Sequence, residues 1–279
     1  MSLSVVIPTL GNDILFKTLE SINNSSVRPD EIIICLPNDS AISIERFKIY
    51  QNIEVLKTKT KGQVAQRAEG FLRAKHEYIL QTDDDIILEN NCIKELIHCS
   101  SKHDKIAVGP KIFDLNNRYH SPRLKSHNSS LYENFIFYLI NGKSGYQAGK
   151  ISSAGIAMGT PDDSKDYNVD WLPGSCILHK KNNLIKYNYY PYLGKAYSED
   201  ILHSMILKKN NIFLVRSAKA KCNVDLNSGI NMSSVFLEFY CVLRIGLYIL
   251  KTKKNIYRYI IFYIATYLLK ALKFIIGKK

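Results

Sequence analysis

The chain has 279 residues, of which 46% are hydrophobic and 23% charged, and its formal net charge is +13. This composition is that of a globular protein, so wholesale disorder is excluded, and the length allows one large core or two small ones. The six cysteines form no CxxC pair and no zinc spacing, so we expect them to be reduced and buried. The start, MSLSVVIPTL, has a short apolar part and no basic segment. No secretory signal is therefore predicted, and we expect the protein to be cytoplasmic.

Strands and helices alternate along the first part of the chain. Short apolar runs predict strands, and apolar residues at helical spacing predict helices. In chain order the expected elements are a strand over Ser4–Ile7, a helix over Asp13–Asn23, strands over Glu31–Leu36 and Ile53–Leu56, a helix over Gly62–Lys75, a strand over Tyr78–Thr82, a helix over Cys92–Ser101 and a strand over Ile106–Phe113. Because the strands are apolar on both faces, they predict a parallel sheet covered by helices on both sides.

The pattern is less regular between residues 114 and 170. This segment has no sustained periodicity apart from the aromatic stretch Tyr132–Ile140, and a connection of such length predicts a binding segment or a partly mobile one. Trp171–His179, with the sequence WLPGSCILH, restores a turn and a strand. A helix is then predicted over Asp200–Lys209, with Glu199 directly before it.

Most of the excess positive charge lies in the C-terminal tail. From Phe239 to Lys279 there are nine basic residues and no acidic one, interleaved with aromatic and aliphatic runs. Helices are predicted over Ser233–Leu250 and Asn255–Ile276, and the longest uncharged stretch of the second is well short of the roughly 20 residues that span a bilayer. We therefore expect residues 233–279 to bind an anionic membrane surface. The alternatives are packing onto the rest of the chain or against a second copy in a homodimer; no nucleic acid is expected, because no recognition motif accompanies the charge.

Three consecutive carboxylates, Asp83, Asp84 and Asp85, follow the predicted strand Tyr78–Thr82. Adjacent carboxylates repel one another, and at the carboxyl end of a strand in an open α/β sheet their simplest partner is a divalent cation that carries a phosphorylated ligand. Oxygen ligands favour a hard ion, Mg²⁺ or Mn²⁺. The alternative is that the three residues only solubilise a loop or cap the helix that follows from about Asn91.

The combination of VVIPTLGN, GQVAQRAEG, QTDDDIIL, WLPGS and SED, in this order and at these distances, resembles family 2 glycosyltransferases of the GT-A fold. The resemblance covers about Leu3–Val215. It implies an α/β fold, with a mainly parallel sheet flanked by helices, and a cytosolic enzyme that takes a sugar from a nucleotide-diphosphate donor with a divalent metal and inverts the anomeric carbon. The domains expected are a catalytic one over 1–232, with a nucleotide-binding half over about 1–113 and an acceptor half over about 114–232, and the tail over 233–279.

The resemblance also implies roles for individual residues. Asp83 and Asp85 match the DxD pair that holds the metal, and Asp84 either contacts the donor or points away. Asp200 matches the catalytic base. The remaining matches are donor-binding positions, Pro8, Thr9, Leu10, Asp39 and Arg67, and acceptor-side positions, Trp171, Gly174, Ser175 and Glu199. Residues alone allow plainer interpretations, because Ser198, Glu199 and Asp200 could simply cap a helix, Arg67 could be solvated and Trp171 could be core.

The sequence departs from the family pattern in three places. In ICLPNDS, Leu36 and Pro37 occupy the usual acidic positions after the second strand, and only a one-residue shift lets Asp39 and Ser40 replace them. The usual aromatic residue after the first proline is Leu10. Finally, no clear histidine follows the last strand of the family pattern: Cys222 and Asn223 lie near where the family often has one.

The function predicted is that of a hexosyl- or deoxyhexosyltransferase, which acts at the inner face of a bacterial-type membrane on a lipid-linked or growing glycan in surface-polysaccharide or lipopolysaccharide assembly. The tail resembles that of rhamnosyltransferase-like members of the family. Two alternatives stay open. A nucleotidyltransferase would need a glycine-rich basic loop after the first strand, whereas LGNDILFK has one glycine and one lysine. A non-catalytic membrane-associated partner would explain the altered ICLPNDS segment.

Overall fold

The structure is a computed structural model, and it describes residues 2–120, 137–138, 142, 146–190, 196, 198–224, 240, 255–262, 264 and 268. The chain forms two compact units. One consists of Met1–His120 and Asp162–Ser228, and the other of Ser121–Pro161 and Gly229–Lys279. The sheet, the helices that flank it and all residues of the candidate site belong to the first unit.

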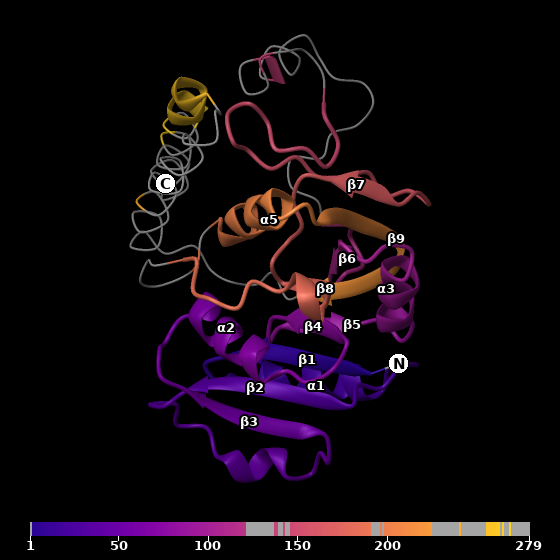
Figure 1. Cartoon of the computed structure of the whole chain (residues 1–279), viewed down its shortest axis with the longest axis vertical. Helices are drawn as coiled ribbons and strands as arrows, with labels where there is room; N and C mark the ends of the chain where they lie inside the picture. Colours follow the sequence, from indigo (N-terminus) through magenta and orange to yellow (C-terminus); the bar gives the residue numbers. More distant parts are fainter. Residues whose placement is uncertain are drawn as a thin grey trace, which may run out of the picture. The chain divides into compact units, whose positions relative to one another are not determined.

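The first unit is built on a nine-stranded sheet (Figure 1). Its strands are β1 (Leu3–Pro8), β2 (Glu31–Pro37), β3 (Ile53–Thr58), β4 (Tyr78–Thr82), β5 (Ile86–Leu88), β6 (Ile106–Asp114), β7 (Tyr167–Val169), β8 (Cys176–Lys180) and β9 (Phe213–Val224). The spatial order is β3-β2-β1-β4-β8-β6-β9-β5, and β7 pairs with β9. β3, β2, β1 and β4 are parallel, β8 is antiparallel to β4 and β6, and β9 is parallel to β6 but antiparallel to β5 and β7.

Helices cover both faces of this sheet. They are α1 (Ile14–Asn23), α2 (Gln63–Arg73), α3 (Cys92–Ser100) and α5 (Glu199–Lys209), and two short 3₁₀ turns lie at Ile44–Phe47 and Lys181–Asn183. Successive residues of a strand point to opposite faces, so Val5 packs with α1 and α3 whereas Val6 packs with α2. α5 packs through Leu207 on Ile177 of β8. The register of β4 and β8 places His179 beside Ile79, which packs with α2. Because Ile177 and His179 are two residues apart and point to the same face, α5 and α2 cover the same face of the sheet.

α2 lies very close to β1 and β2 at Gly70. A Cβ atom at this position would lie 2.5 Å from Val6 Cγ1 and 2.6 Å from Cys35 Sγ, so a larger residue would push the helix away. At this separation the buried Gln66 Nε2 donates hydrogen bonds to the carbonyl groups of Thr9 at 2.9 Å and Cys35 at 2.6 Å. α2 thereby fixes the carboxyl ends of the first two strands relative to each other.

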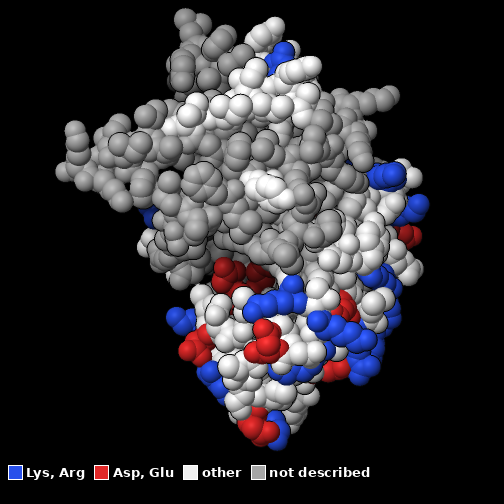
Figure 2. All heavy atoms as spheres, turned by 90° about the vertical axis from the view of Figure 1, so that its left-hand side faces the viewer, with Lys and Arg blue, Asp and Glu red and all other residues white. Residues whose placement is uncertain are grey.

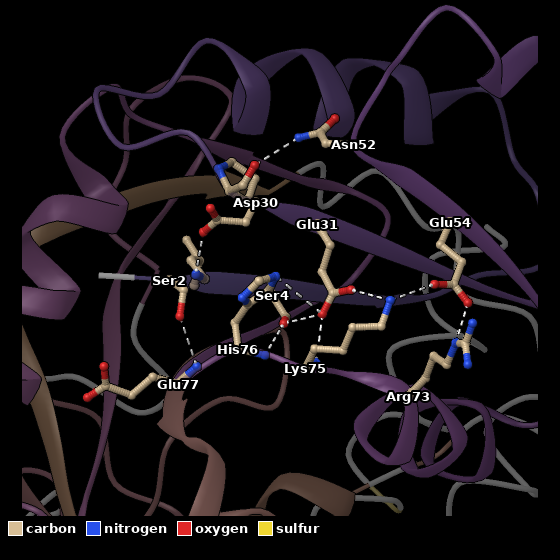
Figure 3. Close-up of polar contacts among 12 residues, drawn as sticks. Ser2, Ser4, Asp30, Glu31, Asn52, Glu54, Arg73, Lys75, His76 and Glu77 are labelled. Atoms are coloured by element: carbon tan, nitrogen blue, oxygen red, sulfur yellow. Dashed lines mark hydrogen bonds and ion pairs between the residues drawn. The ribbon is translucent and has the colours of Figure 1, made fainter.

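At the amino ends of the parallel strands, opposite to the carboxyl ends that α2 contacts, a polar network connects the strands (Figure 3). Glu31, at the start of β2, is 8% exposed and accepts hydrogen bonds from the Ser4 hydroxyl at 2.6 Å and the Lys75 N–H at 2.8 Å. The Lys75 ammonium lies 3.7 Å from Glu31 and 3.8 Å from Glu54, and Glu54 also pairs with Arg73. Because β1, β2, β3 and the segment before β4 all contribute, the network opposes separation of these strands.

The surface of the first unit carries both signs of charge. Exposed ion pairs join Arg46 to Asp13 at 2.9 Å and Lys48 to Glu45 at 2.6 Å. On the face drawn in Figure 2, lysine and arginine lie among aspartate and glutamate rather than in one continuous basic field. Such exposed pairs contribute about 0–1 kcal/mol each, so the fold depends on its cores and buried networks instead.

The structure differs from the sequence-based expectation mainly in the second half of the sheet. The expected parallel arrangement holds for β3, β2, β1 and β4, but the chain returns antiparallel beside β4 as β8 after the long connection over residues 114–170. β5 and β7 were not predicted, because three residues are too few to show a periodicity. The five cysteines that the structure describes are reduced and buried, as predicted.

The second unit joins part of the connection over residues 114–170 to the tail. Asn255 N–H donates to the Ser153 carbonyl at 2.7 Å, and Arg258 Nη1 donates to the Tyr138 carbonyl at 2.6 Å. Residues 256–262, 264 and 268 are helical, in agreement with the predicted final helix. No helix in the described part of the chain is both long and apolar enough to cross a membrane.

Two sequence-based predictions fall largely outside the described residues. They are the helix over Ser233–Leu250 and the aromatic stretch Tyr132–Ile140, of which only Tyr240, Phe137 and Tyr138 are described. The predicted division of the chain at residue 232 stays a prediction.

Candidate active site

The three aspartates form the turn between β4 and β5. The Asp83 N–H donates to the Ser175 carbonyl at 2.8 Å, which holds the turn against the segment that enters β8. The Thr18 hydroxyl donates to the Asp84 carbonyl at 2.8 Å, and the Thr9 hydroxyl donates to the Asp84 carboxylate. Burial raises the pKa of Asp84, and the hydrogen bond from Thr9 opposes this rise. The acidic turn is thus held by residues that follow β1, the strand on one side of β4, and by the residue that precedes β8, the strand on the other side.

Two side chains of α2 hold Asp83. Gln63 Nε2 donates to Asp83 Oδ1 at 2.7 Å, and Arg67 Nη2 donates to the same oxygen at 3.1 Å. Burial raises the pKa of Asp83 to about 7; the positive charge of Arg67 opposes this rise, and the negative charges of Glu199 and Asp85 add to it. Further positive charge near the turn would stabilise the ionised carboxylate.

Arg67 connects this turn to α5. Its side chain is 2% exposed, and its second terminal nitrogen, Nη1, donates to Glu199 Oε1 at 3.1 Å. Burial would lower the pKa of Arg67, but the negative charges of Glu199 and Asp83 raise it above its ordinary value. The other Glu199 oxygen, Oε2, accepts a hydrogen bond from the Tyr189 hydroxyl at 2.6 Å. Arg67 therefore stays a cation between two carboxylates from distant parts of the chain.

The WLPGS segment packs against Glu199. A Cβ atom at Gly174 would lie only 2.1 Å from Glu199 Oε1. The Gly174 carbonyl accepts a hydrogen bond from Gln81 Nε2 at 2.7 Å, and Gln81 Oε1 lies 3.2 Å from His179 Nε2. Trp171 is 7% exposed. The segment thus forms a buried support for Glu199, and the predicted contacts of Trp171, Gly174 and Ser175 with an acceptor stay predictions.

Glu199 and Asp200 begin α5 but differ in environment. Glu199 is 5% exposed, whereas Asp200 is half-buried. Asp200 Oδ1 accepts a hydrogen bond from the Ile201 N–H at 2.8 Å. With 3.6 residues per helical turn, neighbouring side chains point in different directions, so Asp200 is the more accessible of the two carboxylates.

The predicted donor-binding residues of β1 and β2 lie where these strands end. Pro8 and Thr9 are buried, and Leu10 is 55% exposed. Asp39 is exposed and lies 3.4 Å from the Lys61 ammonium. The structure therefore brings Thr9 and Arg67 into contact with the acidic turn, while Leu10 and Asp39 lie at the surface.

Sequence reasoning missed Gln63, Gln66 and Tyr189. Gln66 and Arg67 follow Gln63 by three and four residues, which places them on the same side of α2 as Gln63. Polar residues on a buried helix face are informative, so this spacing in GQVAQR was a usable signal. Tyr189 lies in an irregular segment and gave none.

Asp83 and Asp85 suit a hard divalent cation. In the described part of the chain no group of three or more His, Cys, Asp or Glu residues could hold a metal, so these residues do not form a closed metal site by themselves. Mg²⁺ is usually bound through one or two carboxylates together with substrate phosphates. Burial is the main cause of the raised pKa of Asp83, and the nearby negative charges of Glu199 and Asp85 add to it. The residues fit Mg²⁺ or Mn²⁺ held jointly with a diphosphate.

Comparison with known proteins identifies the family and the fold. The sequence model of the family described as "Glycosyl transferase family 2" matches residues 4–167, which is more than half of the chain. GalNAc-T7, solved with UDP, GalNAc and Mn²⁺, aligns with a TM-score of 0.58 and 16% identity over 85% of this chain and 48% of that one. Residues 1–349 of S. aureus TarS, in complex with UDP-GlcNAc, align with a TM-score of 0.54 and 17% identity over 88% of this chain and 66% of that one.

This chain thus spans about half of the first neighbour's length and just under two thirds of the second's. No curated protein matches the chain in sequence. The family match includes α2 and the acidic turn, whereas Gly174, Glu199 and Asp200 follow it. The neighbours confirm the predicted GT-A architecture, a central sheet between layers of helices. The chain belongs to glycosyl transferase family 2.

Proposed function

We propose that the protein moves a sugar from a nucleotide-diphosphate sugar to a lipid-linked or growing glycan acceptor, with Mg²⁺ or Mn²⁺, and inverts the anomeric carbon. The observation that carries this proposal is the buried Arg67, which bonds to both Asp83 of the acidic turn and Glu199 of α5. Asp200 directly follows Glu199, so the proposed base lies next in the chain to the residue that Arg67 connects to the donor side.

On the donor side, Asp83 and Asp85 would hold the divalent cation. A bound cation stabilises the negative charge that the diphosphate gains as the anomeric C–O bond breaks. The contacts of Gln63 and Arg67 with Asp83, and of Thr9 with Asp84, orient the acidic turn before the donor arrives. The UDP-sugar and Mn²⁺ named for the structural neighbours support this assignment.

On the acceptor side, Asp200 would act as the base. Inversion by direct displacement requires a carboxylate on the side of the sugar opposite the leaving group, where it takes the proton of the attacking hydroxyl. Asp200 is half-buried at the first turn of α5, while both oxygens of Glu199 already accept hydrogen bonds. Asp200 is thus the better placed of the two residues to meet an acceptor.

Calorimetric titration tests the donor site. UDP, dTDP and GDP are titrated with and without Mn²⁺ into the wild type and into Asp85→Ala. We expect Mn²⁺-dependent binding of one nucleotide, lost in the variant. A folded wild type that binds none of them would contradict the proposal and favour the non-catalytic alternative, for which the buried Leu36 at an acidic position of the family is the feature to examine.

Substitution of the proposed base tests the chemistry separately. Asp200→Asn should lower the rate of transfer by about 10²- to 10⁴-fold, the usual contribution of general base catalysis. Its nucleotide affinity should stay within twofold of the wild type. Asp104→Asn, at an exposed position that pairs with Lys180, is the matched control. Substantial turnover by Asp200→Asn would remove Asp200 from this role.

We also propose that the tail holds the enzyme at the inner face of the cell membrane, where a lipid-linked acceptor for surface-polysaccharide synthesis is accessible. Tyr257, Ile261, Ile264 and Leu268 are 76%, 61%, 46% and 60% exposed. Their spacing of four, three and four residues puts them on one face of the helix. An apolar face in a tail whose residues 239–279 include nine basic residues and no acidic one suits an anionic lipid surface.

Sedimentation with liposomes tests this proposal on the full chain. The double substitution Ile261→Glu and Leu268→Glu should release the protein from anionic liposomes, and added salt should weaken wild-type binding. Ile49→Glu, at a 76% exposed apolar position of the first unit, should leave binding unchanged. Unchanged sedimentation of the double variant would refute the lipid contact, and a loss of dimers in light scattering would assign this face to a second copy instead.

A further inference from the structure

We infer that Glu199 is a positioning residue, which acts on the donor site through Arg67 and does not bind the acceptor; this inference rests on the proposed function. The Glu199 side chain is 6% exposed. Its Oε1 accepts from Arg67 at 3.1 Å, its Oε2 accepts from Tyr189 at 2.6 Å, and Gly174 packs against Oε1. An acceptor hydroxyl could reach this carboxylate only by displacing buried partners.

The ion pairs of Arg67 with Asp83 and Glu199 orient these side chains rather than add net stability. Burying charges costs free energy that apolar side chains of the same size would avoid. The guanidinium, however, is planar and donates from two terminal nitrogens at a fixed angle. In this structure one nitrogen donates to the acidic turn and the other to α5. The orientation of Asp83 therefore depends on where Glu199 holds Arg67.

Tyr189 provides the second support for Glu199. Its hydroxyl donates to Glu199, and its ring stacks on that of His203, with centroids 5.4 Å apart and an interplanar angle of 17°. His203 lies four residues after Glu199 in α5, on the same face of the helix. Tyr189 thus fixes both the helix face and the carboxylate. The path from Tyr189 through Glu199 and Arg67 ends at Asp83, which is proposed to bind the metal and the donor.

Glu199→Gln keeps the shape of the side chain and removes its charge. We expect its Kd for the nucleotide that binds the wild type, with Mn²⁺ present, to rise at least fivefold, while the KM for the acceptor stays within twofold. The variant that combines Arg67→Met with Glu199→Gln should bind the nucleotide no more weakly than Arg67→Met alone, because Glu199 acts through Arg67. Multiplied effects in the double variant, or an acceptor KM that rises while donor affinity stays unchanged, would overturn the inference.

Tyr189→Phe keeps the inference testable if Glu199→Gln fails to fold. This substitution removes one hydrogen bond and retains the ring stacked on His203, so the protein should fold and bind the nucleotide two- to fivefold more weakly. Tyr187→Phe, at a 58% exposed position nearby, is the control and should match the wild type. Equal donor affinity in both variants and the wild type would refute the inference alone, whereas a wild type that binds no nucleotide would refute the proposed function.

Discussion

Gly174→Ala should destabilise the protein because the new methyl group competes with the Glu199 carboxylate for space. A Cβ atom at position 174 would lie 2.1 Å from Oε1 and 3.1 Å from Cδ of Glu199. The carboxylate must therefore move by roughly an ångström to restore an ordinary van der Waals separation. This movement would disrupt the bonds from Arg67 at 3.1 Å and from Tyr189 at 2.6 Å.

The expected loss follows from the bonds that are disrupted. Breaking a buried charge pair costs about 3–5 kcal/mol, and a single hydrogen bond to a charged group contributes about 1.5–3 kcal/mol. We therefore expect the free energy of unfolding to fall by about 3 kcal/mol, equivalent to a Tm about 6–12 °C lower at the usual conversion for a domain of this size. Trp171, the single tryptophan of the chain, lies three residues from the substitution and reports urea unfolding by fluorescence.

A double-mutant cycle separates the steric effect from a general effect of alanine. In the Glu199→Ala background the methyl group at position 174 meets no carboxylate, so adding Gly174→Ala should change the free energy of unfolding by less than about 1 kcal/mol. A single Gly174→Ala variant within about 0.5 kcal/mol of the wild type would refute the reasoning. An equal loss in both backgrounds would show that the backbone, rather than Glu199, requires glycine.

Three further predictions concern stability and its pH dependence. Gly70→Ala should cost about 1–3 kcal/mol through overpacking against β1 and β2, and circular dichroism melting should show a lower Tm with unchanged secondary structure. Glu31→Gln should cost about 1–2 kcal/mol in urea unfolding, because a buried charged acceptor is lost, whereas Glu54→Gln, at a more exposed pair, should cost under about 1 kcal/mol. Burial, assisted by the charge of Arg67, lowers the pKa of His203 to about 3, whereas in the unfolded chain a histidine takes up its proton near pH 6.5. Below pH 6.5 the unfolded chain therefore binds more protons than the folded one. His203 should thus lower the free energy of unfolding by about 1.4 kcal/mol for each pH unit below 6.5. His203→Gln should have a correspondingly shallower pH dependence between pH 6.5 and 4, and an equally steep one would contradict the assignment.

The local sequence was sufficient for most elements of the parallel half of the sheet. β1, β2, β3 and β4 are short apolar runs that polar or turn segments interrupt, and such runs predict strands without knowledge of their neighbours. The acidic turn was also evident, because Asp83, Asp84 and Asp85 follow a strand that is apolar on both faces. The antiparallel entry of β8 was not evident, since the direction of a strand after a connection of more than fifty residues depends on tertiary packing.

The site shows the same division between local and tertiary information. By itself the sequence determined which carboxylates are candidates, because charge, spacing and the GQVAQR, TDDD and SED motifs are local properties. The adjacent Glu199 and Asp200 differ only in what surrounds them, so the family resemblance, and not the local pattern, singles out Asp200 as the candidate base. The tertiary structure shows how their surroundings differ: Arg67, 132 residues before Glu199 in the chain, and Tyr189 bond to the two oxygens of Glu199, whereas Asp200 is half-buried. Burial and charge pairing arise between segments that meet only in the folded chain, so these surroundings depend on packing that no local pattern contains.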